Sequence, residues 1–337
     1  MPTIVAGVLG QTSMLDAARR LALNGPASLP RGVPVETVGS WSSLDRSEIE
    51  ELRSAGLVIE EYTTKYFSAQ PLGRPLSIAV FGAPGSGKSF AVKQIISHAL
   101  SGAARILEFN LSQFDDASEL TAAFHQIRDA VLEQRLPLVF WDEFDTPLNE
   151  RRLGWLRHFL APMQDGKFRE GEAFRPLGPA IFIFAGGTAS SFIEFAAVRD
   201  AEAEVVAKKP DFISRLRGYV DVLGPNPKSP QDDAVVLRRA LLLRSLLLRK
   251  APQIVSDSDP GPALRIDPGL LRAFLLASRY KHGARSMEAL IEMSALSGRM
   301  QYEQASLPAP HLLDLHVDAA EFLALATRAE NVDTIRG

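Results

Sequence analysis

The stretch that decides the fold reads Gly82-Ala83-Pro84-Gly85-Ser86-Gly87-Lys88-Ser89 and matches the pattern G-x-x-x-x-G-K-[ST]. An apolar run at 76–81 precedes it and a helical pattern follows it, which is the context that a phosphate-binding loop needs. Glycines let successive backbone N–H groups point inward, and the following helix presents its positive end to the phosphates. A glycine-rich turn without a ligand is the weaker interpretation, because it does not explain the flanking strand and helix. The sequence therefore predicts a binding site for a triphosphate.

Two side chains of the loop have predicted roles of their own. Lys88 is expected to reach the β- and γ-phosphates as a mobile cation. The Ser89 hydroxyl is expected to ligate Mg²⁺, which keeps most of its waters and takes one or two protein oxygens. With Phe90 in the first turn of the helix, the nucleotide-binding segment is predicted to span 82–90.

A second apolar run, Leu138-Val139-Phe140-Trp141, ends in two carboxylates, Asp142 and Glu143. In a parallel sheet both acids would lie at the carboxyl edge, where ligands bind in open α/β folds. Asp142 is expected to hold the metal through water, and Glu143 to orient and polarise the attacking water. Alone, such a strand end is more typical of a solvated loop. The upstream phosphate loop is what favours the catalytic interpretation.

Strand and helix patterns alternate beyond the loop, and the expected fold class is therefore α/β. We expect a P-loop NTPase with a parallel sheet flanked by helices, followed by a small helical lid domain. Asp116 with Glu119 is expected to cap one of these helices. The expected strands after the loop are 105–110, 138–141 and 180–185, and the expected helices are 89–100, 118–134, 153–164, 233–250, 268–280 and 285–298.

The first 70 residues predict a short β-α-β-α-β unit ahead of this core. Segments 3–8, 33–38 and 57–62 have strand patterns, and 13–24 and 45–54 have helical patterns closed by glycines. This unit is either a short module or the end of a larger region. The expected domains are the amino-terminal unit at 1–70, a nucleotide-binding core at 71–225, a helical lid at 226–328 and a tail at 329–337.

Composition argues against several classes of function. The 37 Lys and Arg residues against 40 Asp and Glu leave a net charge of -3, so no global basic field attracts nucleic acid or an anionic membrane. The absence of cysteine excludes disulfides, thiolate metal sites and a cysteine nucleophile. No run approaches the roughly 20 apolar residues of a membrane span, and the first residues lack the basic start of a signal peptide. We expect a cytoplasmic protein without membrane insertion.

The glycine-rich loop, the pair Asp142-Glu143 and the helical region after the sheet together resemble an AAA+ ATPase over about residues 71–325. Segments 159–168 and 180–184 are similar to the helix, hairpin and sensor strand of the Clp-type unfoldase branch. That strand ends in a polar residue that contacts the γ-phosphate. The resemblance gives this role to Thr188, in place of the usual asparagine, with Gly187 as the other register. It also implies that the nucleotide is ATP, because a phosphate loop does not read the base.

The resemblance assigns roles to two arginines as well. Arg215, at the end of the segment 210–215, matches the finger that reaches the nucleotide of a neighbouring subunit, with Arg217 as the reserve candidate. A planar, always charged guanidinium suits the charge that develops on a transferred phosphoryl group. Arg285 matches the second sensor motif, whose arginine reports the nucleotide state from the lid. Without the resemblance, both would be interpreted as surface arginines.

Three further features predict structure rather than chemistry. The six histidines show no metal-ligand spacing, so no zinc site is expected. Phe114 occupies the place where Clp-type unfoldases carry an aromatic and glycine-containing loop, but two aspartates follow it, which favours a helix-capping loop over a peptide grip. In the helix at 233–250, the leucines are expected to pack inward and the basic residues to face solvent. These basic residues are Arg238, Arg239, Arg249 and Lys250.

The expected activity is Mg²⁺-dependent attack of water on the γ-phosphate of ATP. The resemblance implies a ring-like homo-oligomer, a hexamer, that remodels a protein partner whose identity the sequence does not reveal. The alternative is a nucleotide-switched regulatory module of a larger bacterial multidomain protein. Remodelling of nucleic acid is a weaker alternative, because the charge is balanced.

Overall fold

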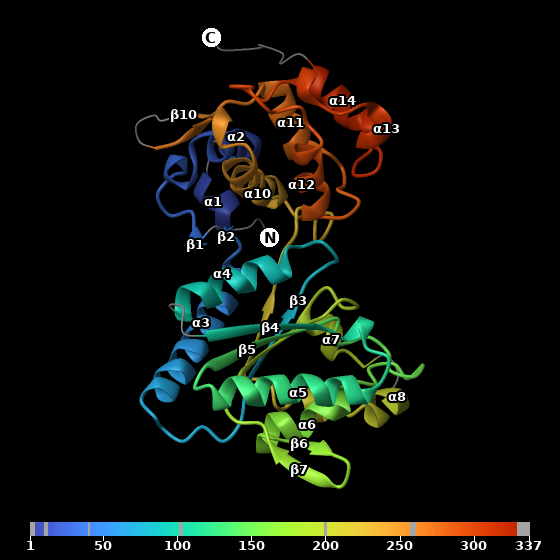
Figure 1. Cartoon of the computed structure of the whole chain (residues 1–337). Helices are drawn as coiled ribbons and strands as arrows, with labels where there is room; N and C mark the ends of the chain where they lie inside the picture. Colours follow the sequence, from blue (N-terminus) through green and yellow to red (C-terminus); the bar gives the residue numbers. More distant parts are fainter. Residues whose placement is uncertain are drawn as a thin grey trace. The chain divides into compact units, whose positions relative to one another are not determined.

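The computed structural model describes residues 4–9, 13–39, 41–100, 104–198, 201–256 and 261–328 (Figure 1). The chain divides into two compact units. The sheet unit comprises Ser47–Pro84 and Lys88–Val222, and the helical unit comprises Met1–Arg46, Gly85–Gly87 and Leu223–Gly337. The expected tail at 329–337 lies outside the described residues.

Five parallel strands form the sheet of the sheet unit, and their order is β4-β5-β8-β3-β9. Every residue of β3 and β8 is buried. The continuous apolar runs of these segments predict such burial, because a parallel strand is covered by helices on both faces of the sheet. The predicted α/β class is therefore confirmed, and β9 is a strand that the sequence patterns did not reveal. The strands are β3 (Leu76–Phe81), β4 (Ala104–Asn110), β5 (Leu136–Asp142), β8 (Ile181–Ala185) and β9 (Gly218–Asp221).

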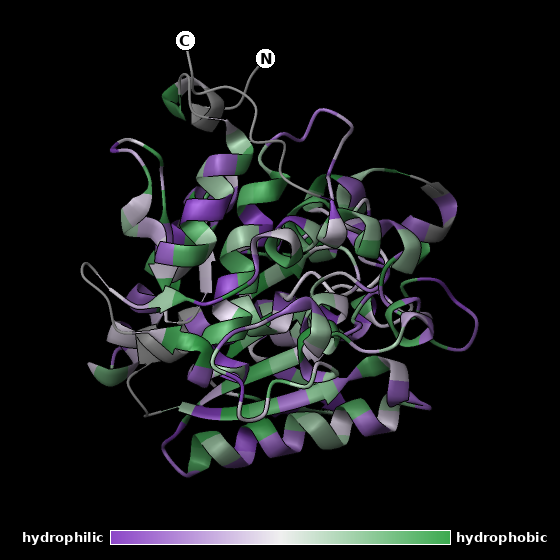
Figure 2. Ribbon diagram, turned by 90° about the horizontal axis from the view of Figure 1, so that it is seen from above, coloured by the Kyte–Doolittle hydropathy of each residue, from purple (hydrophilic) through white to green (hydrophobic). Residues whose placement is uncertain are grey.

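The helices of both units mix hydrophobic and hydrophilic residues, as expected for elements that cover a core on one side (Figure 2). The predicted cap of α5 is confirmed, because the Asp116 side chain accepts a hydrogen bond from the Ser118 N–H at 2.7 Å. The helices of the sheet unit are α3 (Arg46–Phe67, beginning one residue before the unit), α4 (Lys88–Leu100), α5 (Ala117–Leu132), α6 (Leu156–Asp165), α7 (Phe192–Ala196), α8 (Ala201–Val206) and α9 (Lys209–Ile213), and the predicted hairpin is β6 (Lys167–Glu170) with β7 (Ala173–Pro176).

Aromatic rings fill the space between the sheet and these helices. Trp141 of β5 is fully buried and contacts Phe109, Phe124, Phe159 and Phe182 at centroid distances of 4.9–5.7 Å. Such offset and edge-to-face contacts add to the stabilisation from buried area. The end of β5, and the acids that follow it, are therefore anchored in rigid surroundings.

The amino-terminal region differs from the prediction. Residues Ile4–Leu9 form helix α1, and α3 continues through Gly56 to Phe67, so the strands expected at 3–8 and 57–62 are wrong. The reason lies in the spacing of buried residues: Ile49, Leu52, Ala55, Ile59 and Thr63 of α3 recur every three or four positions, while Leu57 is 67% exposed. Packing of this face outweighs the cost of about 1 kcal/mol for a glycine inside a helix. The strands formed here are β1 (Glu36–Val38) and β2 (Trp41–Ser43), which are antiparallel, and helix α2 is Met14–Asn24.

The helical unit is built around α10, and α2 packs against it. Four side chains of α2, including Leu21, are fully buried in this core. The helices here are α10 (Val235–Lys250), α11 (Pro268–Leu276), α12 (Ala284–Glu292), α13 (Pro310–Leu313) and α14 (Ala319–Thr327), with the short strands β10 (Val255–Ser256) and β11 (Ala263–Leu264). The 3-10 turns of the chain are Pro26–Ser28, Leu111–Gln113, Pro252–Ile254 and Gln304–Ser306.

The predicted solvent-facing stripe of α10 is wrong for two of its arginines. Arg238 and Arg239 are buried, and Arg238 forms a two-pronged ion pair with Asp232 at 2.6 and 3.0 Å. Burial alone would raise the pKa of Asp232, but the hydrogen bond from Arg238 holds it below its usual value. Arg239 instead donates to the carbonyls of Pro225 and Leu275, and burial lowers its pKa.

A third buried arginine of α10 joins α2 to this helix. Arg244 donates to the carbonyl oxygens of Ala22 and Leu23 at 3.0 and 2.7 Å, at the end of α2. A cation at this end neutralises the partial negative charge of unpaired carbonyls. The contact explains why α2 belongs to the helical unit, despite lying some two hundred residues away in the sequence.

None of the helices in the described part of the chain combines the length and the hydropathy that a membrane span needs. The expected cytoplasmic location stays a prediction.

The packing of α2 predicts that Leu21→Ala lowers the free energy of unfolding by about 2–5 kcal/mol, because it removes buried methyl groups and leaves a cavity. Urea denaturation followed by circular dichroism measures the change. Leu57→Ala is the matched control: it shortens a helical leucine that is 67% exposed, and we expect an effect within about 0.5 kcal/mol. Equal effects of both changes would contradict the placement of α2.

Candidate functional site

The predicted phosphate loop lies between β3 and α4. Gly82, Gly85 and Gly87 have φ values of 152°, 75° and 94°, which side chains disfavour. The glycines of the motif thus supply the backbone conformation for which the motif needs them. Lys88 opens α4, and its ammonium donates to the Gly82 carbonyl oxygen at 2.7 Å. The lysine therefore lies against the loop that its charge is predicted to serve.

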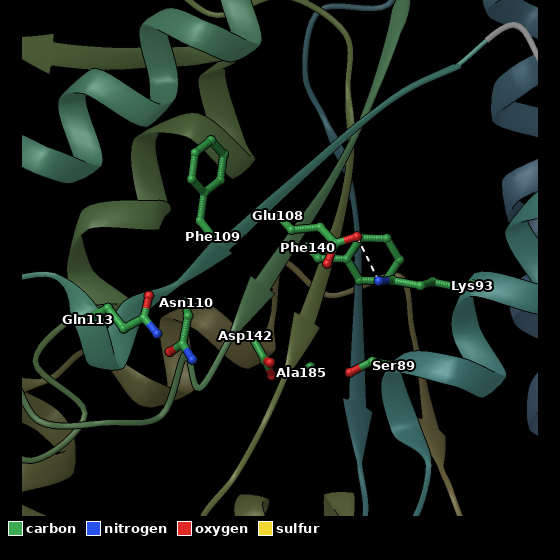
Figure 3. A pocket seen from close by; sticks show the side chains of 9 residues that line it. All are labelled: Ser89, Lys93, Glu108, Phe109, Asn110, Gln113, Phe140, Asp142 and Ala185. Atoms are coloured by element: carbon green, nitrogen blue, oxygen red, sulfur yellow. Dashed lines mark ion pairs between the residues drawn. The ribbon is translucent and has the colours of Figure 1, made fainter.

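Ser89 and Asp142 line the same cavity of about 170 Å³ beside the loop (Figure 3). Sheet register explains their meeting: Asp142 ends β5, opposite Asn110 of β4 and Ala185 of β8, and all three residues line the cavity. The parallel strands end at one edge, so side chains from distant parts of the sequence converge there. On its other side the cavity is bordered by the ion pair between Lys93 and Glu108, with a distance of 2.6 Å.

The donor set of this cavity fits a magnesium ion that binds together with phosphates. A serine hydroxyl and a carboxylate are hard oxygen donors of the kind that Mg²⁺ takes from a protein. Among the described residues, no group of three or more His, Cys, Asp or Glu side chains could hold a metal ion by itself. Ser89 and Asp142 would therefore need phosphate oxygens and water as further ligands.

Glu143 follows at the turn after β5 with a φ of 56°, a left-handed conformation that is uncommon for this residue type. The turn is held by the Glu143 carbonyl, which accepts hydrogen bonds from the Thr146 N–H at 3.0 Å and hydroxyl at 2.8 Å. The Glu143 carboxylate lies against Gly187, where a side-chain carbon added to the glycine would come within 2.3 Å of Oε2. The acid expected to serve the attacking water thus has a defined place at the carboxyl edge of the sheet.

Asp145 is a site residue that the sequence analysis did not single out. It is 2% exposed and accepts hydrogen bonds from the N–H groups of Gly187 and Thr188, each at 2.8 Å, and from the Thr188 hydroxyl. Its partners lie more than 40 positions away in the sequence, so no local pattern could have indicated them. The Thr188 hydroxyl thus donates to Asp145, and its expected contact with the γ-phosphate stays a prediction.

Arg215 lies just before β9, at the amino ends of the strands, whereas the phosphate loop lies at their carboxyl ends. The neighbouring Arg217 N–H donates to the carbonyl of Ser77, near the start of β3, at 2.8 Å. The Arg215 guanidinium donates to the Gln164 side chain and to the Asp211 carbonyl, so its orientation is fixed. Arg74, Arg215 and Arg217 line one cavity of about 400 Å³ with Gln164 and Asp211.

Two further predicted residues have simple surroundings. Arg285 is exposed in the first turn of α12, within the helical unit. Phe114 packs against Phe109 and Trp155 at centroid distances of 6.3 and 6.0 Å. This ring belongs to the edge of the core, which supports the interpretation of its loop as a helix-capping segment.

Residues 78–199 match the family model of the "ATPase family associated with various cellular activities (AAA)". The chain thus contains a segment that is similar to this family. The match includes the loop, the acids after β5 and the segment that holds Thr188, so it supports nucleotide binding and hydrolysis by the matched segment. The predicted likeness to the Clp-type branch stays a prediction.

Two solved structures are similar to the chain at low sequence identity. NtrX from Brucella abortus in complex with ADP is 14% identical with a TM-score of 0.47, over 86% of this chain and 60% of that chain. The ORC2 protein of Aeropyrum pernix, with ADPNP and ADP, is 13% identical with a TM-score of 0.47, over 83% of this chain and 69% of that chain. The chain thus spans about three fifths of the length of NtrX. No curated protein matches the chain.

The position of Lys88 against the phosphate loop predicts that Lys88→Ala weakens ATP binding at least about tenfold. The change removes the charge-assisted hydrogen bond that the ammonium would donate to a phosphate, worth about 1.5–3 kcal/mol. Isothermal titration calorimetry measures the affinity. Lys65→Ala, at an exposed lysine paired with Glu61 on α3, is the matched control and should bind like the parent. Unchanged affinity of the Lys88→Ala protein would count against this site.

Proposed function

We propose that the protein is an ATPase that hydrolyses ATP with Mg²⁺. One observation carries the proposal: Ser89, from the end of the phosphate loop, and Asp142, from the end of β5, line one cavity, and Glu143 is the next residue. Phosphoryl transfer needs little covalent chemistry from the protein, and depends on placing charges and a water molecule correctly. The three residues supply those elements at one edge of the sheet.

In the proposed reaction, water attacks the γ-phosphorus and the bond to the oxygen bridging the β- and γ-phosphates breaks, giving ADP and phosphate. Backbone N–H groups of the loop and Lys88 bind the phosphate charge. Glu143 accepts a hydrogen bond from the water and orients it. Bound Mg²⁺ would neutralise charge on the phosphate oxygens, with Ser89 and Asp142 on its protein side.

Arg215 is proposed to complete the site of a neighbouring subunit. It precedes β9 at the amino edge of the sheet, whereas the loop follows the carboxyl end of β3. The six residues of β3, at about 3.3 Å each, separate the two ends by roughly 20 Å, which exceeds the reach of an arginine side chain. An arginine that assists hydrolysis from this position therefore needs a second copy of the chain. The proposed assembly is a ring-like homo-oligomer, and the hexamer follows from the AAA+ resemblance.

The work done by hydrolysis is proposed to be the remodelling of a dedicated protein partner. The packing of Phe114 against Phe109 and Trp155 argues against threading of generic polypeptides through a grip at this loop. The same observation is equally compatible with the second candidate, a nucleotide-switched regulatory module of a larger multidomain protein, because neither function needs a grip. ATP turnover stimulated by a partner would support remodelling, while ATP-dependent assembly with negligible turnover would support the switch.

Glu143→Gln is expected to retain ATP binding and to lower kcat at least about 100-fold, because an amide cannot accept the proton of the attacking water. Phosphate release measures turnover, and titration calorimetry measures binding. Glu172→Gln, at an exposed residue of the β6–β7 turn, makes the same chemical change away from the site and should leave both unchanged. Hydrolysis at the parental rate by the Glu143→Gln protein would show that another group serves the water.

The substitution Arg215→Ala is expected to abolish ATP turnover. A mixture of the Arg215→Ala and Lys88→Ala proteins is expected to regain part of this turnover. Mixed assemblies contain interfaces in which an intact loop faces an intact arginine, so activity returns only if Arg215 acts across subunits. Analytical ultracentrifugation with ATP and Mg²⁺ reports the assembly, and Arg169→Ala, at an exposed arginine of β6, is the control. A monomer with full activity, or proven mixing without recovery, would contradict the proposal.

A further inference from the structure

The loop after β8 is attached to the turn after β5 by one buried carboxylate. Asp145 uses Oδ1 to accept the Gly187 N–H, and Oδ2 to accept the N–H and the hydroxyl of Thr188. Charge-assisted hydrogen bonds of this kind are about twice as strong as neutral ones. Three donors on a single side chain therefore fix the position of Gly187 and Thr188 relative to β5.

The fixed loop forms the surface against which the Glu143 carboxylate rests. A side-chain carbon built on Gly187 would lie 2.3 Å from Oε2, 2.8 Å from Cδ and 3.0 Å from Oε1 of Glu143. The first two distances are under 3.0 Å, which real Cβ atoms essentially never show, so the end of the Glu143 side chain would have to shift. Gly187 does not have a positive φ, so it is needed here for space and not for backbone conformation.

The backbone of Glu143 is held independently. Thr146 binds the Glu143 carbonyl through its N–H and its hydroxyl, while the carboxylate extends toward Gly187. The main chain of Glu143 is thus held by Thr146, while its carboxylate lies against a different segment at Gly187. Displacing either segment would move the carboxylate relative to the cavity at Asp142.

We propose that Asp145, Gly187 and Thr188 are positioning residues that set the place of the Glu143 carboxylate for hydrolysis. The inference rests on the proposed function, because it requires Glu143 to serve the water. Asp145 acts through the loop, Gly187 by leaving room, and Thr188 by donating its hydroxyl to Asp145 instead of contacting the γ-phosphate. A displacement of about 1 Å from the productive geometry can cost about 100-fold in rate.

The first test is Gly187→Ala, which adds a single methyl group under the carboxylate. We expect kcat to fall about 10- to 100-fold while the affinity for ATP, measured by titration calorimetry, stays within about twofold. Gly218→Ala is the matched control, since a side-chain carbon there meets nothing within 4 Å and φ is not positive. Thermal unfolding shows whether each variant keeps its fold.

A double-mutant cycle separates positioning from a general structural effect. If Gly187→Ala acts through Glu143, then adding it to Glu143→Gln causes no further loss of the single-turnover rate. An additional loss equal to that of the single variant would overturn the inference. Parental kcat in a folded Gly187→Ala protein would overturn it as well.

Thr188→Val distinguishes the two roles of that residue. The valine lacks the hydroxyl that donates to Asp145, so kcat should fall. The ratio of the affinity for a non-hydrolysable ATP analogue to the affinity for ADP should not change. Thr188→Ser keeps a hydroxyl and should retain more of the rate. A lowered ratio would instead identify a γ-phosphate contact and overturn this part. A parent protein without ATPase activity would overturn the proposed function and the inference together, whereas activity lost in Glu143→Gln and kept in Gly187→Ala would overturn the inference alone.

Discussion

The hydrogen bonds of β3 to strands on both of its sides are the constraint on which the site depends. β3 pairs in parallel with β8 and with β9, so the phosphate loop extends from the middle of the sheet and not from a free edge. Since β8 pairs in parallel with both β3 and β5, the carboxyl ends of the three strands lie on the same side of the sheet. Strand pairing therefore brings the phosphate loop, the two acids at the end of β5 and the glycines after β8 close together.

The parallel pairing of the strands also places the phosphate loop and Arg215 at opposite ends of the strands. The phosphate loop, Asp142 and Glu143 lie at the carboxyl ends of the strands, while the segment of Arg215 enters the sheet at the amino end of β9. The length of β3 acts as a fixed spacer between them. In the proposed assembly, an arginine at the amino end of β9 would therefore serve the site of another copy of the chain.

Local patterns were sufficient to predict the phosphate loop, the two acids at the end of β5, and the helices α4, α5 and α6, since each is encoded by neighbouring residues. They did not predict α7, α8 and α9. The two strands expected near the amino terminus were wrong, because short apolar runs fit a buried helix face as well as a strand. The burial of Arg238 and Arg239 could not be predicted, since their partners are carbonyls and a carboxylate brought close only by folding. Asp145 was not predicted for the same reason: its three donors belong to a loop that follows α6, the β6–β7 hairpin and β8.

The position of α2 has a consequence for shortened versions of the chain. The stretch at 71–75, rich in proline and glycine, looks like a natural place to cut, because the nucleotide-binding core begins directly after it. In the folded molecule that cut would remove material from both units: α2, which covers α10, and α3, whose Tyr62 hydroxyl donates to the Arg74 carbonyl at 2.8 Å and accepts from the Ala180 N–H at 3.2 Å. A fragment that starts there would retain every residue of the phosphate loop and still expose the leucines of α10, an apolar surface that favours aggregation.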